Sequence, residues 1–395
     1  MVQDQHVAVT SNTSRLGIVL SGYAPAMTLM SGAMLGFAQK QVAFDIISTS
    51  GVGGLIGLLS LAPKAKPTPA EALAELPNLF MSDLLYALFP VNVKLFFKYG
   101  PFSEPFWKFR KRLPTFPVAP EDASPFRRLM NDWVDLAMSA VTPTTYDFFS
   151  QGLLTEVPLI ADLVDFERLK QASTTFYLNA FNLSNCQLHI FDKQSLNADA
   201  YHAAQSMFFL FRPQRIRSQV FSLGTTHDPT GLHALWTRHK HDLDMIIALD
   251  TVSASIWREP VNIYDAFQLM LVNPIVALEE LLFALYAKTE YLVNTYKPGK
   301  RLPKLYRVPF DAIPKSYYPE MLTWTHSNAV TLQRIGREAA TTFAEVLQSG
   351  DAQALEAYRY HHYVEGNPRL ECFLRIFPRL FAPPETAQSR EETTA

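Results

Sequence analysis

Residues 44–59, FDIISTSGVGGLIGLL, contain two hydrophobic segments separated by Ser50 and the glycines that follow it. Ser50 lies where a strand-like run gives way to a helical one. A serine on such a bend can act as a nucleophile, because the unpaired N–H groups at the helix start can stabilise an oxyanion. Ser48 and Val52 replace the two glycines of the usual G-x-S-x-G spacing. The same residues also fit a serine that only caps the helix.

The chain around Ser50 alternates between the two hydrophobic periodicities. Apolar runs typical of strands lie at residues 16–21, 42–47, 175–178, 187–191, 216–222 and 245–249, and helical spacing at residues 26–39 and 52–61. Strands that alternate with helices predict a parallel sheet with right-handed crossovers. After residue 260 the pattern is mostly helical, notably at 261–287 and 327–348.

Composition and charge exclude several classes of protein. The chain of 395 residues is 48% hydrophobic, 12% aromatic and 18% charged, which is typical of a globular protein with a large core. A net charge of −2 gives no basic field, so we expect no nucleic-acid partner. With only Cys186 and Cys372, a disulfide framework and a cysteine zinc site are excluded. The histidines between His227 and His241 lack zinc spacing, so we expect neither a metal nor a cofactor.

The N-terminal segment favours a cytoplasmic protein. Asp4 stands where a secretory signal would carry positive charge. Residues 16–38 carry no formal charge and are long enough to cross a bilayer, but Gly22 and Pro25 interrupt them. We therefore expect a strand and a helix there. The low cysteine content fits a reducing compartment.

The order of these motifs resembles that of the patatin-like lipid acyl hydrolases. The family begins with a strand, a glycine-rich oxyanion loop and a helix, followed by a second strand that enters G-T-S-A-G; residues 17–34 and 44–54 match in order and spacing. Later parts of the family core resemble residues 175–191, 201–216 and 242–252. The resemblance implies a three-layer α/β/α fold with a mainly parallel central sheet over about residues 15–255, and it implies that Ser50 is the nucleophile.

The resemblance also implies an oxyanion hole. Gly22 matches the first glycine of the family's loop, whereas Tyr23 and Ala24 stand where the family has glycines and alanine. Pro25 has no N–H to donate. The implied donors are the N–H groups of Gly22, Tyr23, Ala24 and Gly51.

The second catalytic group departs from the family pattern. The family activates its serine with an aspartate from a D-G-G or D-G-A turn, where this chain has Leu223 before Gly224. The nearest carboxylate is Asp228, preceded by His227, so either Asp228 or a His227 oriented by it is expected to take the proton from Ser50. The alternatives are a plain turn at HDPTG and a site without a base, which would bind without hydrolysing.

The chain is predicted to have five parts. They are a flexible N-terminus (1–14), the patatin-like hydrolase domain (15–255), an aromatic-rich insertion or lid within that domain (about 64–140), a helical C-terminal extension (256–382) and a disordered tail (383–395). Within the insertion, residues 79–117 interleave aromatic and basic side chains. That composition suits contact with an anionic lipid surface, and equally a cap that buries its aromatic side chains on the core.

These features predict a serine-dependent lipid acyl hydrolase of the phospholipase or lipase type. Its substrate would be a lipid or another acyl ester, and residues 79–117 would make peripheral contact with a membrane or lipid particle. The same pattern fits an acyltransferase that uses Ser50. It also fits a catalytically impaired protein of this fold that binds lipid or a protein partner, or that acts as a scaffold on a membrane or granule. No oligomeric state follows from the sequence.

Overall fold

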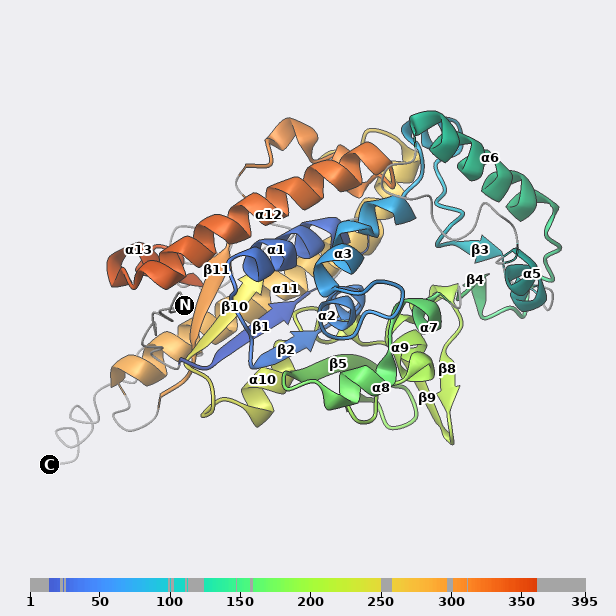
Figure 1. Cartoon of the computed structure of the whole chain (residues 1–395). Coiled ribbons are helices and arrows are strands. Elements are labelled where there is room, and N and C mark those ends of the chain that lie inside the picture. The colour runs from blue at the N-terminus through green and yellow to red at the C-terminus, as the bar shows by residue number, and fades with distance from the viewer. Residues whose placement is uncertain are drawn as a thin grey trace, which may run out of the picture.

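The computed structural model of the chain has a central β-sheet with helices on both faces (Figure 1). It describes residues 14–360 except for 22, 23, 25, 99, 101, 102, 111, 113–123, 147, 157, 158, 250–257, 297–300 and 311. The predicted flexible N-terminus, apart from residue 14, and the predicted disordered tail lie outside the described residues. The α/β architecture agrees with the fold class predicted from the alternating pattern.

Parallel strands make up most of the central sheet. Its strands are β1 (Leu16–Leu20), β2 (Ile46–Thr49), β5 (Thr175–Asn182), β6 (Gln187–Asp192), β8 (Gln214–Ile216), β9 (Gln219–Leu223), β10 (Met245–Leu249) and β11 (Lys304–Val308). Strands β11, β10, β1, β2 and β5 pair in parallel in that order, whereas β6 and β9 are antiparallel to β5, and β8 is antiparallel to β9. A smaller sheet joins β3 (Phe97–Lys98), β4 (Gly152–Thr155) and β7 (Phe209–Phe211).

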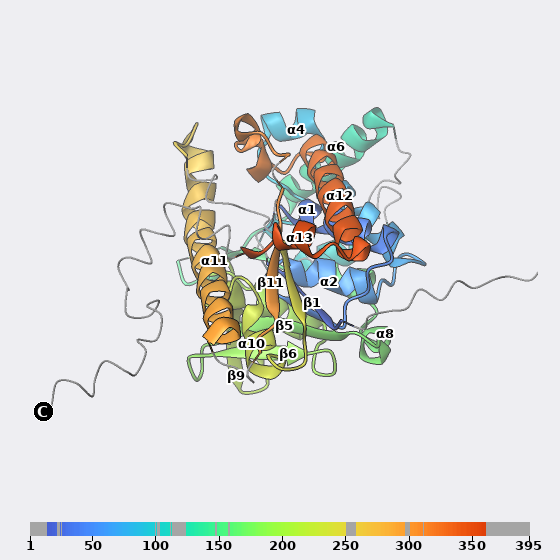
Figure 2. The ribbon, with the colours of Figure 1, turned by 90° about the vertical axis from the view of Figure 1, so that its left-hand side faces the viewer.

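Helices cover the sheet on both faces (Figure 2). One layer contains α1 (Met27–Gln39), α2 (Gly53–Leu61), α3 (Pro69–Ala74) and α12 (His326–Ser349), and the other contains α10 (Leu232–Arg238) and α11 (Ile263–Tyr296). The remaining α-helices of the described chain are α4 (Asp83–Leu88), α5 (Ser103–Arg110), α6 (Pro125–Val141), α7 (Ile160–Leu163), α8 (Phe166–Gln171), α9 (Ala198–Gln205) and α13 (Ala352–Glu356).

Apolar side chains of β1 pack against the helix layers on both faces of the sheet. Ile18 and Leu20 pack into the cluster under α1, α2 and α12, and Val19 packs into the cluster under α10 and α11. Successive strand side chains point to opposite faces, so a strand covered on both faces reads as an unbroken apolar run. The run at 16–21 predicted this strand for that reason.

The segment predicted as a C-terminal extension contributes to the core. Its strand β11 pairs with β10 in the central sheet, and its helix α12 packs along α1. Phe343 of α12 is fully buried and lies edge-on to Phe37 of α1, with ring centroids 6.2 Å apart. This segment therefore shares one hydrophobic core with the strands around Ser50.

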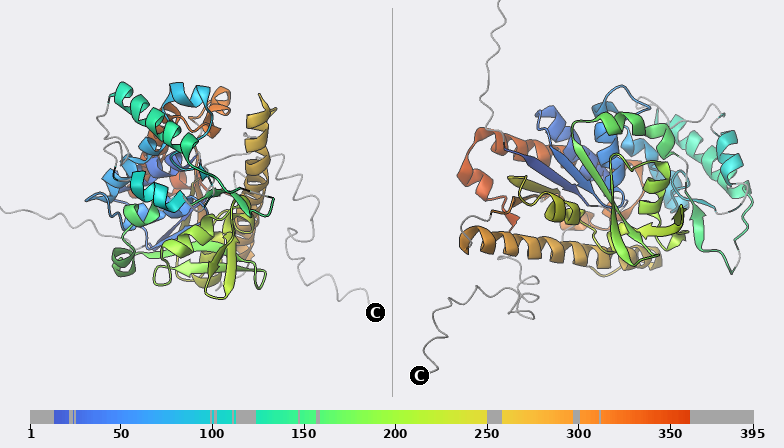
Figure 3. Two further views of the ribbon diagram at one scale, coloured as in Figure 1. Left: turned by 90° about the vertical axis from the view of Figure 1, so that its right-hand side faces the viewer. Right: turned by 90° about the horizontal axis from the view of Figure 1, so that it is seen from below.

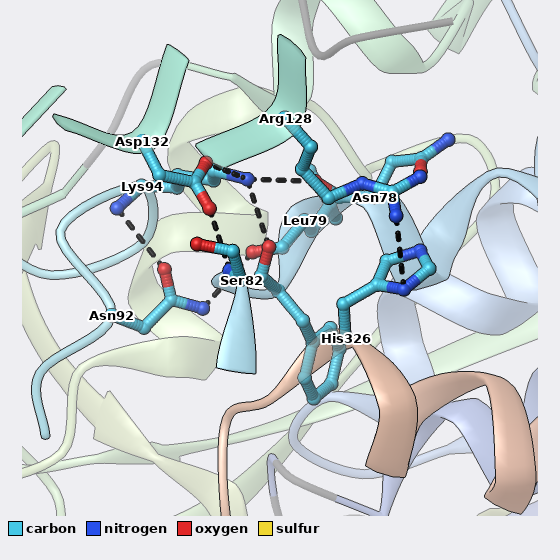
Figure 4. A network of polar contacts seen from close by, with 9 residues as sticks. Asn78, Leu79, Ser82, Asn92, Lys94, Arg128, Asp132 and His326 are labelled. Atoms are coloured by element: carbon cyan, nitrogen blue, oxygen red, sulfur yellow. Dashed lines mark hydrogen bonds and ion pairs between the residues drawn. The ribbon is translucent and has the colours of Figure 1, made fainter. Parts of the chain in front are cut away.

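A network of hydrogen bonds and an ion pair around Asp132 connects the insertion to α12 (Figure 4). The fully buried Asp132 carboxylate lies 2.7 Å from the Lys94 ammonium and accepts the Ser82 N–H at 2.6 Å. Arg128, one turn earlier on α6, lies 3.2 Å from Nδ1 of His326, the first residue of α12. The network thus joins α6 of the insertion to the N-terminus of α12.

Acidification is expected to weaken this attachment through His326. Burial, reinforced by the positive charges of Arg128 and Lys94, lowers the pKa of His326 to about 4 from its ordinary 6.5. The unfolded chain binds a proton below pH 6.5, whereas the folded chain does so only near pH 4. The free energy of unfolding therefore falls as the pH drops through this interval, by up to about 3 kcal/mol from this group.

Urea unfolding at pH 7 and at pH 4.5 measures this contribution. Between these two values His326→Gln should lose about 2 kcal/mol less stability than the unmodified chain, since glutamine does not titrate. Equal losses in the two proteins would show that His326 is not the responsive group.

Within the described residues, α11 is the helix long and apolar enough to cross a membrane, over Asp265–Thr295, judged by length and composition alone. In this structure its side chains Phe283 and Tyr286 are buried against the sheet. The uncharged stretch at residues 16–38 contains β1 and α1, as the sequence predicted.

Candidate active site

The chain turns sharply at Ser50, between β2 and α2. The Ser50 N–H donates to the Leu20 carbonyl of β1 at 3.1 Å, and the Gly53 N–H closes the turn on the Ser50 carbonyl, also at 3.1 Å. Gly51 has a φ of 53°, a conformation that residues with a side chain rarely adopt. A Cβ on Gly53 would lie 2.1 Å from the Leu20 carbonyl oxygen. The two glycines therefore permit the bend and the close contact between the start of α2 and β1.

The Ser50 hydroxyl lies 3.0 Å from the hydroxyl of Thr225 because two strands end against each other. β2 pairs with residues 175–178 of β5, and β9 pairs with residues 180–182. Since β6 occupies the opposite edge of β5 along residues 177–182, β2 and β9 share one edge and meet end to end. Thr225 belongs to the 3-10 turn η2 (Gly224–Thr226) that follows β9.

Ser50 has a polar neighbour on each side at this end of the sheet. In β1, Ser21 follows the residue paired with Thr49, and in β5, Asn179 follows the residue paired with Thr49. Neighbouring strands lie about 4.8 Å apart. Ser21, Ser50 and Asn179 therefore form a row across the carboxyl ends of β1, β2 and β5, which we call the serine row.

The serine row faces α10 and α11. Val19, Ile46 and Tyr177 lie an even number of residues earlier on the same three strands, and all three pack in the cluster under these helices. Because strand side chains alternate between faces, the serine row points the same way. Its members are at most 3% exposed, so the row is a buried polar feature in an apolar layer.

Asp228 joins the serine row through Asn179. The Asn179 amide donates to the Asp228 carbonyl at 2.7 Å and to its carboxylate at 3.2 Å. The same carboxylate accepts the Thr230 hydroxyl at 2.6 Å and the His233 N–H at 3.2 Å. Asp228 thus anchors the loop between β9 and α10 to β5, while the hydroxyl of Ser50 is paired with Thr225.

His227 lies further from Ser50. Its ring stacks on Phe181 with centroids 3.5 Å apart, and Nδ1 lies 2.9 Å from the Thr226 hydroxyl. Phe181 is two residues beyond Asn179 on β5, a displacement of about 7 Å. Partial desolvation lowers the pKa of His227. Proton transfer by His227 or by Asp228 stays a prediction.

The start of α2 carries backbone donors without partners. Among the described residues, the N–H groups of Gly51 and Val52 find no protein acceptor. The positive end of the helix dipole lies at the same place. Two such N–H groups beside Ser50 suit an oxygen that becomes negatively charged.

The other donors implied by the family resemblance follow β1 in the sequence. Ala24 borders the same cavity as Gly51. Gly22 and Tyr23 lie outside the described residues.

A cavity of about 450 Å³ opens beside the bend, which is within the usual size range of small-molecule sites. Gly51, Val52 and Leu223 form the wall next to Ser50, and further walls come from the insertion, β4, α7, α9 and α11. The lining is mainly aliphatic and aromatic, and the Gln205 amide beside it donates to the Gly51 carbonyl at 2.6 Å. Such a cavity suits an acyl chain. Ser50 itself is fully buried behind this wall.

Comparison with known proteins identifies no family. No protein-family model and no curated protein matches the chain. One similar solved structure is that of VipD from Legionella pneumophila, with a TM-score of 0.38 and 11% identity; the match covers 84% of this chain and 67% of that of VipD. Membership of the patatin-like family therefore stays a prediction.

Three buried polar residues at this site were not singled out from the sequence: Thr225, Asn179 and Ser21. Asn179 carried a signal, since it is a polar residue within the apolar run TFYLNAF. Thr225 carried none, because its place depends on which edge of β5 receives β9. Within the part of the chain that the structure describes, no three His, Cys, Asp or Glu side chains group as metal ligands would.

Proposed function

We propose that the protein is a serine-dependent acyl hydrolase that takes the acyl chain of a carboxylic ester into the cavity and attacks its carbonyl with Ser50. One observation carries the proposal. The helix start that follows Ser50 presents the N–H groups of Gly51 and Val52, which have no acceptor in the part of the chain that the structure describes, and these two residues also line the apolar cavity. An ester carbonyl at the inner wall would meet both the nucleophile and the oxyanion donors.

The reaction follows from these positions. Ser50 Oγ leaves its contact with Thr225 and bonds to the carbonyl carbon while a base takes its proton. The carbonyl oxygen becomes an oxyanion that accepts from the Gly51 and Val52 N–H groups. The intermediate collapses, the alkoxide leaves with the proton, and water then hydrolyses the acyl-serine by the same steps. Two buried carboxylates contact the serine row and are the candidate bases: Asp228, which accepts from Asn179, and Glu279 of α11, which accepts from Ser21.

The burial of Ser50 favours a second candidate function. Its side chain is 0% exposed and paired with Thr225. The resemblance to the patatin-like hydrolases also implies that Leu223 stands where that family has its aspartate. A protein of this kind would hold an acyl chain in the cavity without cleaving it. Both candidates use the same cavity and differ only in the reactivity of Ser50.

A fluorophosphonate probe separates the two candidates, because it reacts only with an activated serine. We expect stoichiometric labelling that maps to Ser50 by peptide mass spectrometry, together with hydrolysis of p-nitrophenyl esters and phospholipid. Ser50→Ala should abolish both, whereas Ser60→Ala, on the helix α2 that follows Ser50, should leave both unchanged within about twofold. An unlabelled Ser50 in a protein that still binds fatty acid would establish the second candidate.

We further propose that the insertion contacts a lipid surface through α4. Leu84 and Leu88 lie one turn apart on this helix and are 62% and 60% exposed. Val91, just beyond α4, is 49% exposed and also lines the cavity, so this face adjoins the substrate site. An apolar helix face of this kind can enter the boundary between lipid head groups and acyl chains.

Placing charge on this face should release the protein from vesicles. The double variant Leu84→Asp with Leu88→Asp is expected to weaken binding to vesicles of mixed anionic and neutral phospholipid at least about tenfold, because two apolar side chains no longer leave water. Flotation measures the bound fraction. Val330→Asp adds charge at an exposed apolar position outside 79–117 and should bind as the unmodified protein does. Equal binding by the double variant would refute contact through α4.

A further inference from the structure

A carboxylate interrupts the apolar stripe that α11 presents to the sheet. Val276 and Phe283, about one turn to either side, are 0% and 2% exposed, and Glu279 between them is 4% exposed. Burying a carboxylate is unfavourable unless hydrogen bonds stabilise it. The hydroxyl of Ser21 donates to Glu279 Oε1 at 2.6 Å. Glu279 is therefore bonded to the residue next to Ser50 in the serine row.

Glu279 also lies close to the inner end of the cavity. Along α11, which runs the length of the sheet in Figure 3, Leu271 and Ile275 line the cavity. Glu279 follows Ile275 by four residues and so lies on the same side of the helix, one turn further along. The same side of α11 thus lines the cavity and, one turn further along, carries the Glu279 carboxylate that contacts the serine row.

We infer that Ser21 and Glu279 form the proton relay that activates Ser50, an inference that rests on the proposed acyl hydrolase function. Ser50 Oγ first turns from Thr225 toward Ser21 Oγ at the end of the neighbouring strand. As Ser50 Oγ then bonds to the carbonyl carbon, its proton passes to Ser21 Oγ, and the Ser21 proton passes to the Glu279 carboxylate. The carbonyl π electrons become the oxyanion. When the ester C–O bond breaks, the proton returns along the relay to the leaving alkoxide and Glu279 is again ionised. A hydroxyl can serve here because it both donates and accepts hydrogen bonds.

A proton path from Ser50 to Asp228 would pass through an amide instead of a hydroxyl. The group of Asp228's network that adjoins Ser50 in the row is the amide of Asn179, whose NH₂ donates to Asp228 and whose Oδ1 is an acceptor without a hydrogen-bond partner among the described residues. An amide holds its N–H protons far more tightly than a hydroxyl holds its proton. A proton cannot be handed on through this amide. The remaining contacts of the Asp228 carboxylate, with Thr230 and His233, hold the loop before α10.

The rate of Ser50 labelling by a fluorophosphonate tests the relay. Glu279→Gln keeps the shape of the side chain and an oxygen that can accept from Ser21, but it cannot take a proton. We expect labelling to slow by about 10²–10⁴-fold, the usual contribution of a general base. Glu279→Asp, which restores a carboxylate, should recover part of the rate. Glu280→Gln changes the next, also buried, carboxylate on α11 and should label within about twofold of the unmodified protein.

A second variant keeps the test decisive if Glu279→Gln disturbs folding. Ser21→Ala removes the relay hydroxyl and should slow labelling to a similar degree. Combined with Glu279→Gln it should add little, because residues that act as one unit are non-additive. A structural role would instead lower the thermal stability of each variant and leave the labelling rate of the folded protein unchanged. If the unmodified protein labels at Ser50 and Glu279→Gln labels equally fast, the relay is refuted and the hydrolase stands. If the unmodified protein labels at Ser21 or not at all, the proposed function falls as well.

Discussion

A tryptophan at Leu271 is expected to lower the affinity for a long acyl chain by about 100-fold. Leu271 lies on the α11 wall of the cavity, and a larger side chain there takes space that the chain would occupy. Each buried methylene contributes about 0.8 kcal/mol, so the loss of roughly four methylenes from the cavity amounts to about 3 kcal/mol, which is the factor of 100. Titration with a fluorescent long-chain fatty acid measures the affinity whether or not the protein hydrolyses esters.

The neighbouring residue provides the matched control. Met270 is 61% exposed, so Met270→Trp adds the same side chain to the same helix on its solvent side and should leave the affinity unchanged. Hydrolysis of a butyrate ester separates blockage from damage, because a short chain still fits. If Leu271→Trp binds the long chain as tightly as Met270→Trp does, the acyl chain does not lie in this cavity.

Local patterns predicted the elements around Ser50 closely. The apolar run at 16–21 became β1, the helical spacing at 26–39 became α1, and the glycine-rich segment at 52–61 became α2. These elements are buried on nearly every side, which agrees with their almost continuous sequences of apolar and small residues. Where the local preference and the tertiary environment coincide, a single sequence suffices.

Other elements depended on features without a local signal. The apolar run at 216–222 was predicted as one strand, but β8 and β9 form a hairpin there, turned at Arg217 with a φ of 54°. An arginine gives no sign of a left-handed turn. The strand β11 was not predicted within the helical C-terminal pattern, since its sequence KLYRV is short and becomes a strand by pairing with β10.

Part of the candidate site could likewise be predicted from the local sequence, and part depends on the tertiary fold. The bend at Ser50 is encoded locally by the small residues around it, and the sequence located it. Its contacts come from distant parts of the chain: Thr225 reaches it through β9, and Glu279 reaches Ser21 from α11. A search for the nearest carboxylate along the chain led to Asp228, which lies in the same polar region but bonds to Asn179. Register and layer order, which decide such contacts, are properties of the folded sheet.

Alanine at Gly336 is expected to destabilise the fold by about 3 kcal/mol, at the upper end of the range for overpacking. α1 and α12 pack so closely that a Cβ at Gly336 would lie 2.1 Å from the Leu29 carbonyl oxygen, and one at Gly32 would lie 1.9 Å from the Gln333 carbonyl oxygen. The obstructing atoms belong to the backbone, which cannot turn aside as a flexible side chain can. The two helices must therefore separate, and the packing of Phe343 in the shared core loosens with them.

Gly350 ends the same helix and offers the comparison. It has a φ of 71° and nothing within 4 Å of an added Cβ. Gly350→Ala should therefore lose only the conformational penalty of about 1–2 kcal/mol, with no separation of helices. Urea unfolding gives both stabilities, and the two variants should also differ in amide exchange. In Gly336→Ala, protection should fall along α1 as well as α12, because the contact between the helices is what the new methyl group disturbs. A loss confined to α12 would mean that the helix bends locally and that the α1 interface tolerates the methyl group.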